Sequence, residues 1–285
     1  MFCFQPGIPG ALAQDAIALR AIHADLHAQL TRNQFRRPLY LESSETRQEI
    51  QGDIYALIEQ PFAVVGPALH DMGNWCDILI LHLNVKSCRA STPEAGDTLS
   101  LNIGRKYEQS LADAYLFEFL YSVLDATPAY LQVGLNADEG PMGTSRYRVA
   151  LEVVELDSGR SFLHLSYSYA YGILARITMQ GYLATIGHDK VGFSIVGQDL
   201  DGQPVHIGGL RGVVERNTMR YYLAIDAFLG ALSLPASEQT EQRLNDWYAG
   251  AERYPTQLNE LERGEYLDMK RNEIRRQQAP GRAAD

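Results

Sequence analysis

The sequence predicts an α+β fold in which a curved antiparallel sheet of about seven strands wraps around one long helix. Seven segments of the 285-residue chain alternate apolar and polar residues, as strands with one covered face do. Short turn sequences such as Asp157-Ser158-Gly159 separate several of them, and such short connections produce antiparallel hairpins. One stretch, residues 209–232, repeats apolar residues at helical spacing and is the expected cover of the sheet.

The remaining elements follow from local patterns. A helix is expected over 16–33, followed by an extended connection over 35–44. Alternation begins again at Glu49, and the strands are expected at 49–58, 86–90, 98–106, 113–123, 129–136, 146–156 and 161–171. Prolines and apolar spacing predict further helices at 63–71, 76–83, 173–186, 239–253 and 255–276, the last with Pro255 as its first residue.

Aromatic side chains alternate along two of the predicted strands. Because successive side chains of a strand point to opposite faces, these residues form one apolar surface that carries hydroxyl groups. They are Tyr115, Phe117, Phe119, Tyr121, Tyr167, Tyr169 and Tyr171. We expect them, together with Tyr221 and Ile225 of the covering helix, to line a ligand cavity. A solidly packed aromatic core is the alternative.

The order of elements resembles the START-like helix-grip (SRPBCC) superfamily. Phe62 to Cys76 resembles its paired short helices, and Tyr147 to Tyr171 resembles its final hairpin. The resemblance covers about residues 49–232 and implies a hydrophobic cavity between sheet and helix, used in that superfamily for lipids, sterols, polyketides or other apolar molecules. Two departures are an insert, residues 173–208, which would lid or fill such a cavity, and a helical extension.

We therefore expect three parts. They are an N-terminal leader and helix (1–45), a helix-grip domain (46–233) that contains the insert, and a C-terminal helical extension (234–285). The whole chain also resembles a group of exported bacterial proteins of this class, through the stretch Arg211 to Tyr222 among others.

The cysteines leave one question open. Cys3, Cys76 and Cys88 show no C-x-x-C spacing, which argues against a zinc or thioredoxin-like site. Cys76 and Cys88 meet only if a short helix turns back into a strand, and two unbonded buried thiols are the alternative. The resemblance to exported proteins favours the bond and a periplasmic location.

The N-terminus does not settle the location. Ala11-Leu12-Ala13 looks like a signal-peptidase site, but no basic residue precedes it. We interpret the segment as a truncated or mis-started signal peptide, with a flexible leader and a cytoplasmic location as the alternative.

Charge and hydropathy exclude other classes of function. The net charge of -10 argues against a nucleic-acid surface. We interpret the basic residues Lys270, Arg271, Arg275 and Arg276 as a solvated helix face. No apolar run approaches the roughly 20 residues that cross a bilayer.

Few residues of the sequence suggest a catalytic or ligand-binding role. Arg216 and Arg220, near the start of the covering helix, suit an acidic head group at the cavity mouth, whereas an ion-pair network with Glu118, Glu152 or Asp226 is the structural alternative that we favour. His82, Lys86 and His164 are the other candidates for polar groups in a pocket. Nucleophile and metalloprotease motifs are absent.

The sequence thus predicts a non-enzymatic protein, without cofactor or metal, that binds or transports an apolar or amphipathic small molecule. One alternative is an enzyme that uses His82, His164, Glu118 or Arg216 in the same cavity. The other is an interaction module whose C-terminal helices expose Trp247, Tyr248, Tyr254, Tyr266 and Met269.

Overall fold

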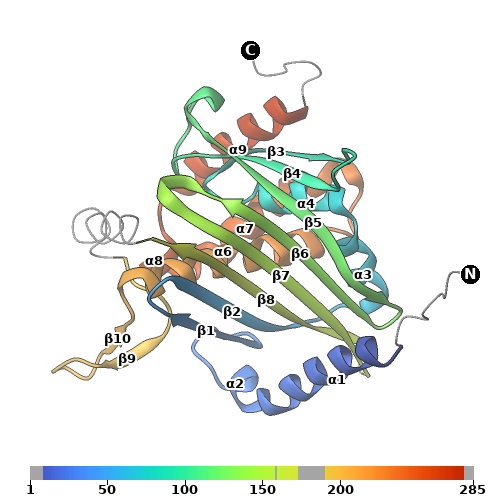
Figure 1. Ribbon diagram of the computed structural model, residues 1–285. Helices are drawn as coiled ribbons and strands as arrows, with labels where there is room; N and C mark the ends of the chain where they lie inside the picture. Colours follow the sequence, from blue (N-terminus) through green and yellow to red (C-terminus); the bar gives the residue numbers. More distant parts are fainter. Residues whose placement is uncertain (1–8, 158, 173–189, 279–285) are drawn as a thin grey trace, which may run out of the picture.

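An eight-stranded antiparallel sheet forms the centre of the computed structural model, which describes residues 9–157, 159–172 and 190–278 (Figure 1). The strand order is β1-β2-β8-β7-β6-β5-β4-β3. The strands are β1 (Leu39–Glu45), β2 (Glu49–Ile58), β3 (Val85–Ser91), β4 (Thr98–Ile103), β5 (Tyr115–Thr127), β6 (Tyr130–Glu139), β7 (Thr144–Leu156) and β8 (Arg160–Tyr171). A separate exposed hairpin contains β9 (Ile195–Gln198) and β10 (Pro204–His206).

The helices lie on both faces of this sheet. α1 (Pro9–Asp25) lies against the outer face, and α2 (His27–Thr31) follows it. The inner face carries α3 (Phe62–His70), α4 (Met72–Leu79) and α6 (Gly209–Gly230), with α7 (Ala236–Glu252), α8 (Pro255–Leu258) and α9 (Arg263–Gln278) beyond them. None of the described helices is both long and apolar enough to span a bilayer.

The connectivity from β2 to α6 is that of the helix-grip fold. Strand β2 leads into the paired helices α3 and α4, six consecutive antiparallel strands follow, and the last of them, β8, returns to lie beside β2. α6 then crosses the inner face against β1, β2 and β8. The predicted fold class is confirmed.

A glycine allows α6 to approach the sheet closely. Gly52 lies on the inner face of β2, where a Cβ atom would stand 2.5 Å from Thr218 Oγ1 and 3.5 Å from Val214 Cγ1. A Cβ atom at this position would force the Thr218 side chain or α6 itself to shift. The helix predicted over 209–232 therefore packs against the sheet as expected.

Strand β1 was not expected. The prediction of an extended connection over 35–44 was wrong, because residues 39–45 pair with β2 from Leu39↔Ala56 to Glu45↔Ile50. Only Leu39 and Leu41 of this strand are buried, and its second half is polar. So little alternation gives a weak strand signal, and the sheet has eight strands instead of seven.

The last predicted helix is broken. The prediction of one helix over 255–276 was wrong, because α8 ends at Leu258 and α9 starts at Arg263. Glu265 accepts a hydrogen bond from the Glu262 backbone N–H and thereby caps the restart. The break places Glu260 in the loop between the two helices.

The C-terminal helices pack back on the domain. Trp247, Tyr254, Tyr266 and Met269 are each at most 9% exposed, and Tyr248 is partly buried. The interaction-module alternative needs these side chains at the surface, so their burial removes its basis.

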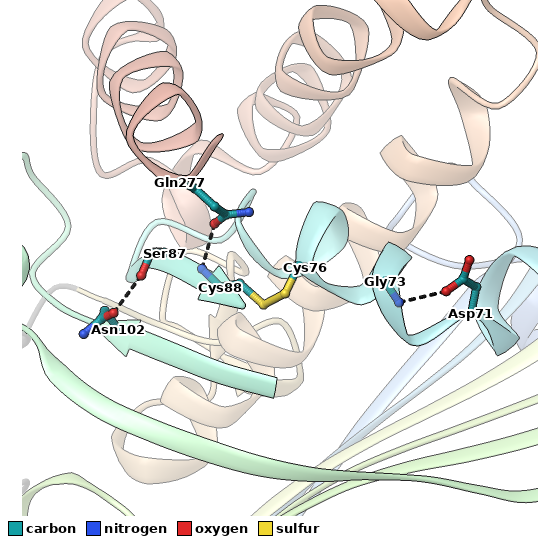
Figure 2. The surroundings of a disulfide bond; sticks show 7 residues. All are labelled: Asp71, Gly73, Cys76, Ser87, Cys88, Asn102 and Gln277. Atoms are coloured by element: carbon teal, nitrogen blue, oxygen red, sulfur yellow. Dashed lines mark hydrogen bonds between the residues drawn. A yellow bond between two sulfur atoms is a disulfide. The ribbon is translucent and has the colours of Figure 1, made fainter. Parts of the chain in front are cut away.

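A disulfide joins α4 to the edge strand β3 (Figure 2). The chain turns back between Leu79 and Val85, which brings the Cα atoms of Cys76 and Cys88 to 5.2 Å. Gln277 of α9 accepts the Cys88 backbone N–H at 2.7 Å, so α9 covers a group that an open sheet edge would leave unpaired. The helix predicted at 173–186 lies outside the described residues.

Candidate functional site

Six aromatic side chains form a connected set on the inner face of the sheet. We call Phe117, Phe119, Tyr147, Tyr167, Tyr169 and Tyr221 the aromatic interior. Phe117 contacts Phe119 and Tyr147 with ring centroids 4.5 and 4.9 Å apart. Tyr147 stacks on Tyr169 at 5.1 Å, and Tyr167 meets Tyr221 of α6 edge-on at 5.3 Å. The set therefore runs from β5 across β7 and β8 to the covering helix.

Three hydroxyls of the aromatic interior are unused. Tyr147 shares a hydrogen bond of 2.8 Å with Thr144, whereas the hydroxyls of Tyr167, Tyr169 and Tyr221 make no hydrogen bond with any described residue. Burial raises the pKa of Tyr147 to about 12 and that of Tyr167 well above its ordinary value. All four phenols stay neutral at physiological pH and keep the ability to donate a hydrogen bond.

Three of the aromatic residues that the sequence predicted to line the cavity do not belong to this set. Tyr115 is 42% exposed at the start of β5 and reaches only Phe117. Tyr121 donates to the His70 carbonyl at the end of α3, and Tyr171 donates to the Thr46 carbonyl beside β1. Tyr115 therefore lies at the rim, while Tyr121 and Tyr171 fasten the sheet to neighbouring segments. Ile225 is buried one turn of α6 beyond Tyr221.

Next to Tyr221 lies a group of charges that we call the cationic corner: Lys106, Lys190, Arg220 and Glu260. Lys106 Nζ and Arg220 Nη2 both bind Glu260 Oε1, at 2.6 and 2.9 Å, and Lys190 Nζ lies 4.0 Å from Oε2. Burial alone would raise the pKa of Glu260, but Lys106 and Arg220 outweigh it and lower that pKa. Glu260 is therefore a carboxylate shared by three cations.

His82 sits where the aromatic interior meets the corner. Its ring stacks on Tyr221 at 4.8 Å, and its Nδ1 accepts the Asn84 backbone N–H at 3.2 Å. Burial, with Arg220 and Lys270 nearby, lowers the pKa of His82 well below its ordinary value. The imidazole is neutral, and because Nδ1 is the acceptor, the hydrogen is on Nε2.

Two buried donors at this place have no acceptor. His82 Nε2 and Arg220 Nε are both inaccessible and unpartnered, in residues only 3% and 2% exposed. An unsatisfied buried donor costs about 1–3 kcal/mol, so such groups are uncommon in native proteins. Five other buried polar atoms of the described residues are also unpartnered, Arg243 Nε and Arg276 Nε among them. The two donors at this place differ in lying close to each other and to Tyr221, where one acceptor could serve both.

The arginines of α6 do not form the predicted network. Arg220 pairs with Glu260, whereas Glu118, Glu152 and Asp226 bind Ser100, His164 and Arg37 instead. The favoured prediction of an ion-pair network was thus correct for Arg220 in kind but wrong in partner. Arg216 is 5% exposed and donates to the Val191 carbonyl at 3.1 Å.

His164 and Glu118 lie away from this site. Both point to the outer face of the sheet, where His164 is held between Glu152 at 2.8 Å and Asp53 at 3.0 Å. Burial alone would lower the pKa of His164, but the two carboxylates outweigh it and raise that pKa to about 9. The residues of the predicted enzyme alternative therefore do not converge. The described part of the chain also holds no cluster of side chains suited to a metal ion.

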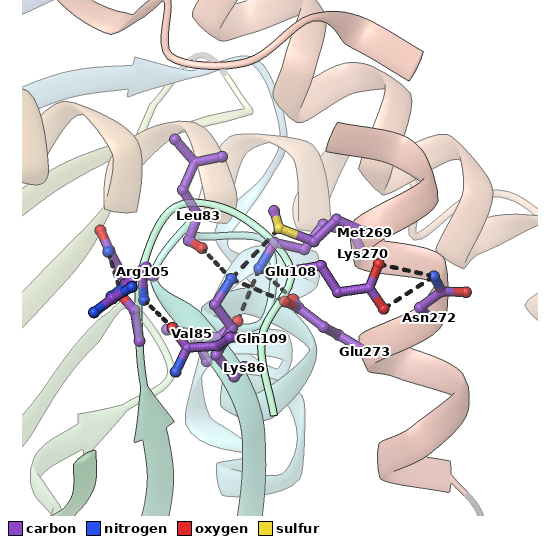
Figure 3. Close-up of polar contacts among 12 residues, drawn as sticks. Leu83, Val85, Lys86, Arg105, Glu108, Gln109, Met269, Lys270, Asn272 and Glu273 are labelled. Atoms are coloured by element: carbon purple, nitrogen blue, oxygen red, sulfur yellow. Dashed lines mark hydrogen bonds and ion pairs between the residues drawn. The ribbon is translucent and has the colours of Figure 1, made fainter. Parts of the chain in front are cut away.

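Lys86, the third polar candidate, belongs to a structural cluster (Figure 3). We call Lys86, Lys270 and Glu273 the α9 latch. Glu273 binds Lys86 at 2.9 Å and Lys270 at 2.8 Å, and all three side chains are at most 1% exposed. The interpretation of Lys270 as part of a solvated face was wrong, because its ammonium donates to the His82 and Val85 carbonyls and lies inside the protein.

Sequence reasoning missed four residues of the site: Tyr147, Lys106, Lys190 and Glu260. Tyr147 follows Arg146, whose φ is 49°, and the pairing of β7 with β8 is irregular at this point. The alternation of aromatic residues that the sequence showed therefore does not extend to Tyr147. Lys106 ends a predicted strand, and Glu260 lies in a loop inside a predicted helix. The period-two pattern Tyr147, Val149, Leu151 was the only local signal.

An apolar groove of about 320 Å³ lies elsewhere, between α3 and the β5–β6 turn. Phe62, Pro67 and Leu131 contribute to its walls. It does not include the aromatic interior or the corner.

Comparison with known proteins adds little to this description. No family model and no curated protein matches the chain. Among solved structures it is similar to norcoclaurine synthase from Thalictrum flavum, with 10% identity, 52% of this chain and 80% of that chain covered, and a TM-score of 0.32. Human StAR-related lipid transfer protein 5 also has 10% identity and a TM-score of 0.32, with coverages of 62% and 91%.

CalU16 from Micromonospora echinospora has 12% identity, coverages of 75% and 96%, and a TM-score of 0.31. Likenesses this weak carry no argument about the site. The chain has the helix-grip fold by its own strand order and connectivity.

Proposed function

We propose that the protein binds an apolar or amphipathic small molecule between the sheet and α6, as a carrier or sensor and not as an enzyme. One observation carries the proposal. The aromatic interior joins three hydroxyls that make no hydrogen bond with any described residue to two buried donors without acceptors. A core that only stabilises the fold gains nothing from the two buried donors, because a buried polar group without a partner lowers stability.

The chemistry of the site favours binding over catalysis. Ligand pockets are largely apolar and contain a few polar groups that orient the ligand. Catalysis by His82 would need a group that orients it and a second participant, but among the described side chains no carboxylate contacts its ring.

The experiment is native mass spectrometry of protein purified from its own host, combined with solvent extraction of bound molecules. We expect a bound mass that extraction releases and that an apolar chain or ring system accounts for. Recovery of the ligand-free protein alone, with no uptake of added decanoate or decan-1-ol, would contradict the proposal.

We also infer that the protein works in an oxidising compartment such as the periplasm. The disulfide between Cys76 and Cys88 supports this location, because such bonds persist outside the reducing cytoplasm. Alkylation of host-purified protein tests it. The peptides of both cysteines should react with iodoacetamide only after reduction, and reaction before reduction would contradict the inference.

A further inference from the structure

We propose that the ligand carries a carboxylate head group, which the cationic corner and His82 receive while its apolar body lies along the aromatic interior. This inference rests on the function proposed above.

The first argument is charge. Lys106, Lys190 and Arg220 surround the single carboxylate of Glu260, with N–O distances of 2.6, 4.0 and 2.9 Å. Among the described residues, three positive charges therefore face one negative charge. Arg220 is 2% exposed, so water screens its charge poorly. A second carboxylate would reduce this surplus.

The second argument is hydrogen bonding. The guanidinium of Arg220 uses Nη1 on Asn217 and Nη2 on Glu260, and its Nε–H remains without an acceptor. The Nε2–H of His82 also lacks one. Both groups can only donate, whereas an ionised carboxylate can only accept and has about four lone-pair sites for such donors. An ammonium head group could not accept from either of these two donors.

The third argument is position. Arg220 and Tyr221 are adjacent on α6, and the Tyr221 ring contacts both His82, at 4.8 Å, and Tyr167, at 5.3 Å. The unused donors thus lie where the aromatic interior begins. An acid whose head binds at the corner has its apolar part next to Tyr221 and Tyr167.

The test is isothermal titration of the full chain with decanoate and with decan-1-ol, which has the same chain length but no charge. A charge-assisted hydrogen bond predicts at least about tenfold tighter binding of decanoate. Arg220→Met should remove most of this preference, because it weakens the binding of decanoate much more than the binding of decan-1-ol. Lys106→Met, a change in a partly exposed loop, tests the same point if Arg220→Met does not fold.

Arg211→Met is the matched control. It removes the same charge from the same helix, but Arg211 donates to Ser43 and has no contact with Glu260. It should keep the preference for decanoate.

Each outcome is decisive. Equal affinity of the wild type for decanoate and decan-1-ol would overturn the head-group inference and leave the proposed function standing. Tighter binding of decyl phosphate than of decanoate would overturn the assignment of a carboxylate. Binding of none of these probes would overturn the head-group inference, and together with recovery of only ligand-free protein from the host it would also overturn the proposed function.

Discussion

Two clusters of this protein, one fully buried and one partly exposed, each place several cations around one carboxylate, and they differ in how their donors are used. In the α9 latch, Lys270 Nζ donates to two carbonyls and Glu273, and Lys86 Nζ contacts the Leu83 carbonyl, Met269 Sδ and Glu273. In the cationic corner, Arg220 Nε contacts no acceptor, and neither does Nε2 of the adjoining His82.

This difference in hydrogen bonding distinguishes a cluster that stabilises the fold from one that suits ligand binding. A cluster whose donors are all satisfied holds two elements together, in this case α9 and β3. A cluster that leaves buried donors unsatisfied sacrifices stability, and such a sacrifice is typical of binding sites. His82 links the two clusters, because its carbonyl accepts from Lys270 while its ring lies at the corner.

The largest expected effect is in the latch. Glu273→Gln leaves two fully buried lysines without a counter-charge, and breaking a buried pair in this way costs about 3–5 kcal/mol. Urea unfolding measures the loss. Glu260→Gln is the matched change in the corner, where Lys106 is 32% exposed, and it should cost clearly less. Equal losses would break the distinction between the clusters.

Removal of the disulfide should cause the second-largest loss of stability. Replacing Cys76 and Cys88 together by serine removes a cross-link between residues 12 apart, and loop-closure entropy predicts a loss of roughly 3 kcal/mol in the free energy of unfolding. Denaturation of the oxidised wild type and the double variant tests this value. A loss below about 1 kcal/mol would mean that the latch already holds β3 without the bond.

His164, on the outer face, is a third charged group with all of its partners, and its contribution to stability depends on pH. The pKa of His164 is raised to about 9 in the folded protein, above its ordinary value of 6.5. Its stabilising contribution is therefore complete below pH 6.5 and is lost as the pH rises through 9. The loss should reach at most roughly 3 kcal/mol.

Urea unfolding between pH 6 and pH 9.5 measures this effect as the difference between the wild type and His164→Gln. The difference should shrink as the pH rises. A difference that is constant with pH would show that Asp53 and Glu152 do not hold a charged imidazole.

The smallest expected effect is in the corner. Arg220→Met removes a cation from a group with surplus positive charge, and Glu260 keeps its contact with Lys106. Replacing a buried charge by an apolar side chain is often neutral, so we expect a loss below about 1 kcal/mol. Lys270→Met in the latch should cost more. The opposite order would show that the corner is the structural cluster.

The sequence predicted the fold better than the site. Repeated alternation and turn residues were enough for seven strands and the α6 helix, because each signal is local. Strand β1 escaped, since its pairing with β2 and not its own pattern makes it a strand.

The corner depends on contacts that no local pattern encodes. Glu260 meets Arg220 and Lys106 from positions 40 and 154 residues away, through a loop that interrupts a predicted helix. Arg220 and His82 were both named as candidates from the sequence, but only the structure brings them to the same tyrosine ring.

The most direct test of the binding site is a crystal structure of the protein with decanoate. We predict that a carboxylate oxygen lies about 3 Å from Arg220 Nε or His82 Nε2, with the alkyl chain against Tyr167. Decanoate found only in the apolar groove beside α3, with both donors still unpartnered or bound to water, would contradict the account.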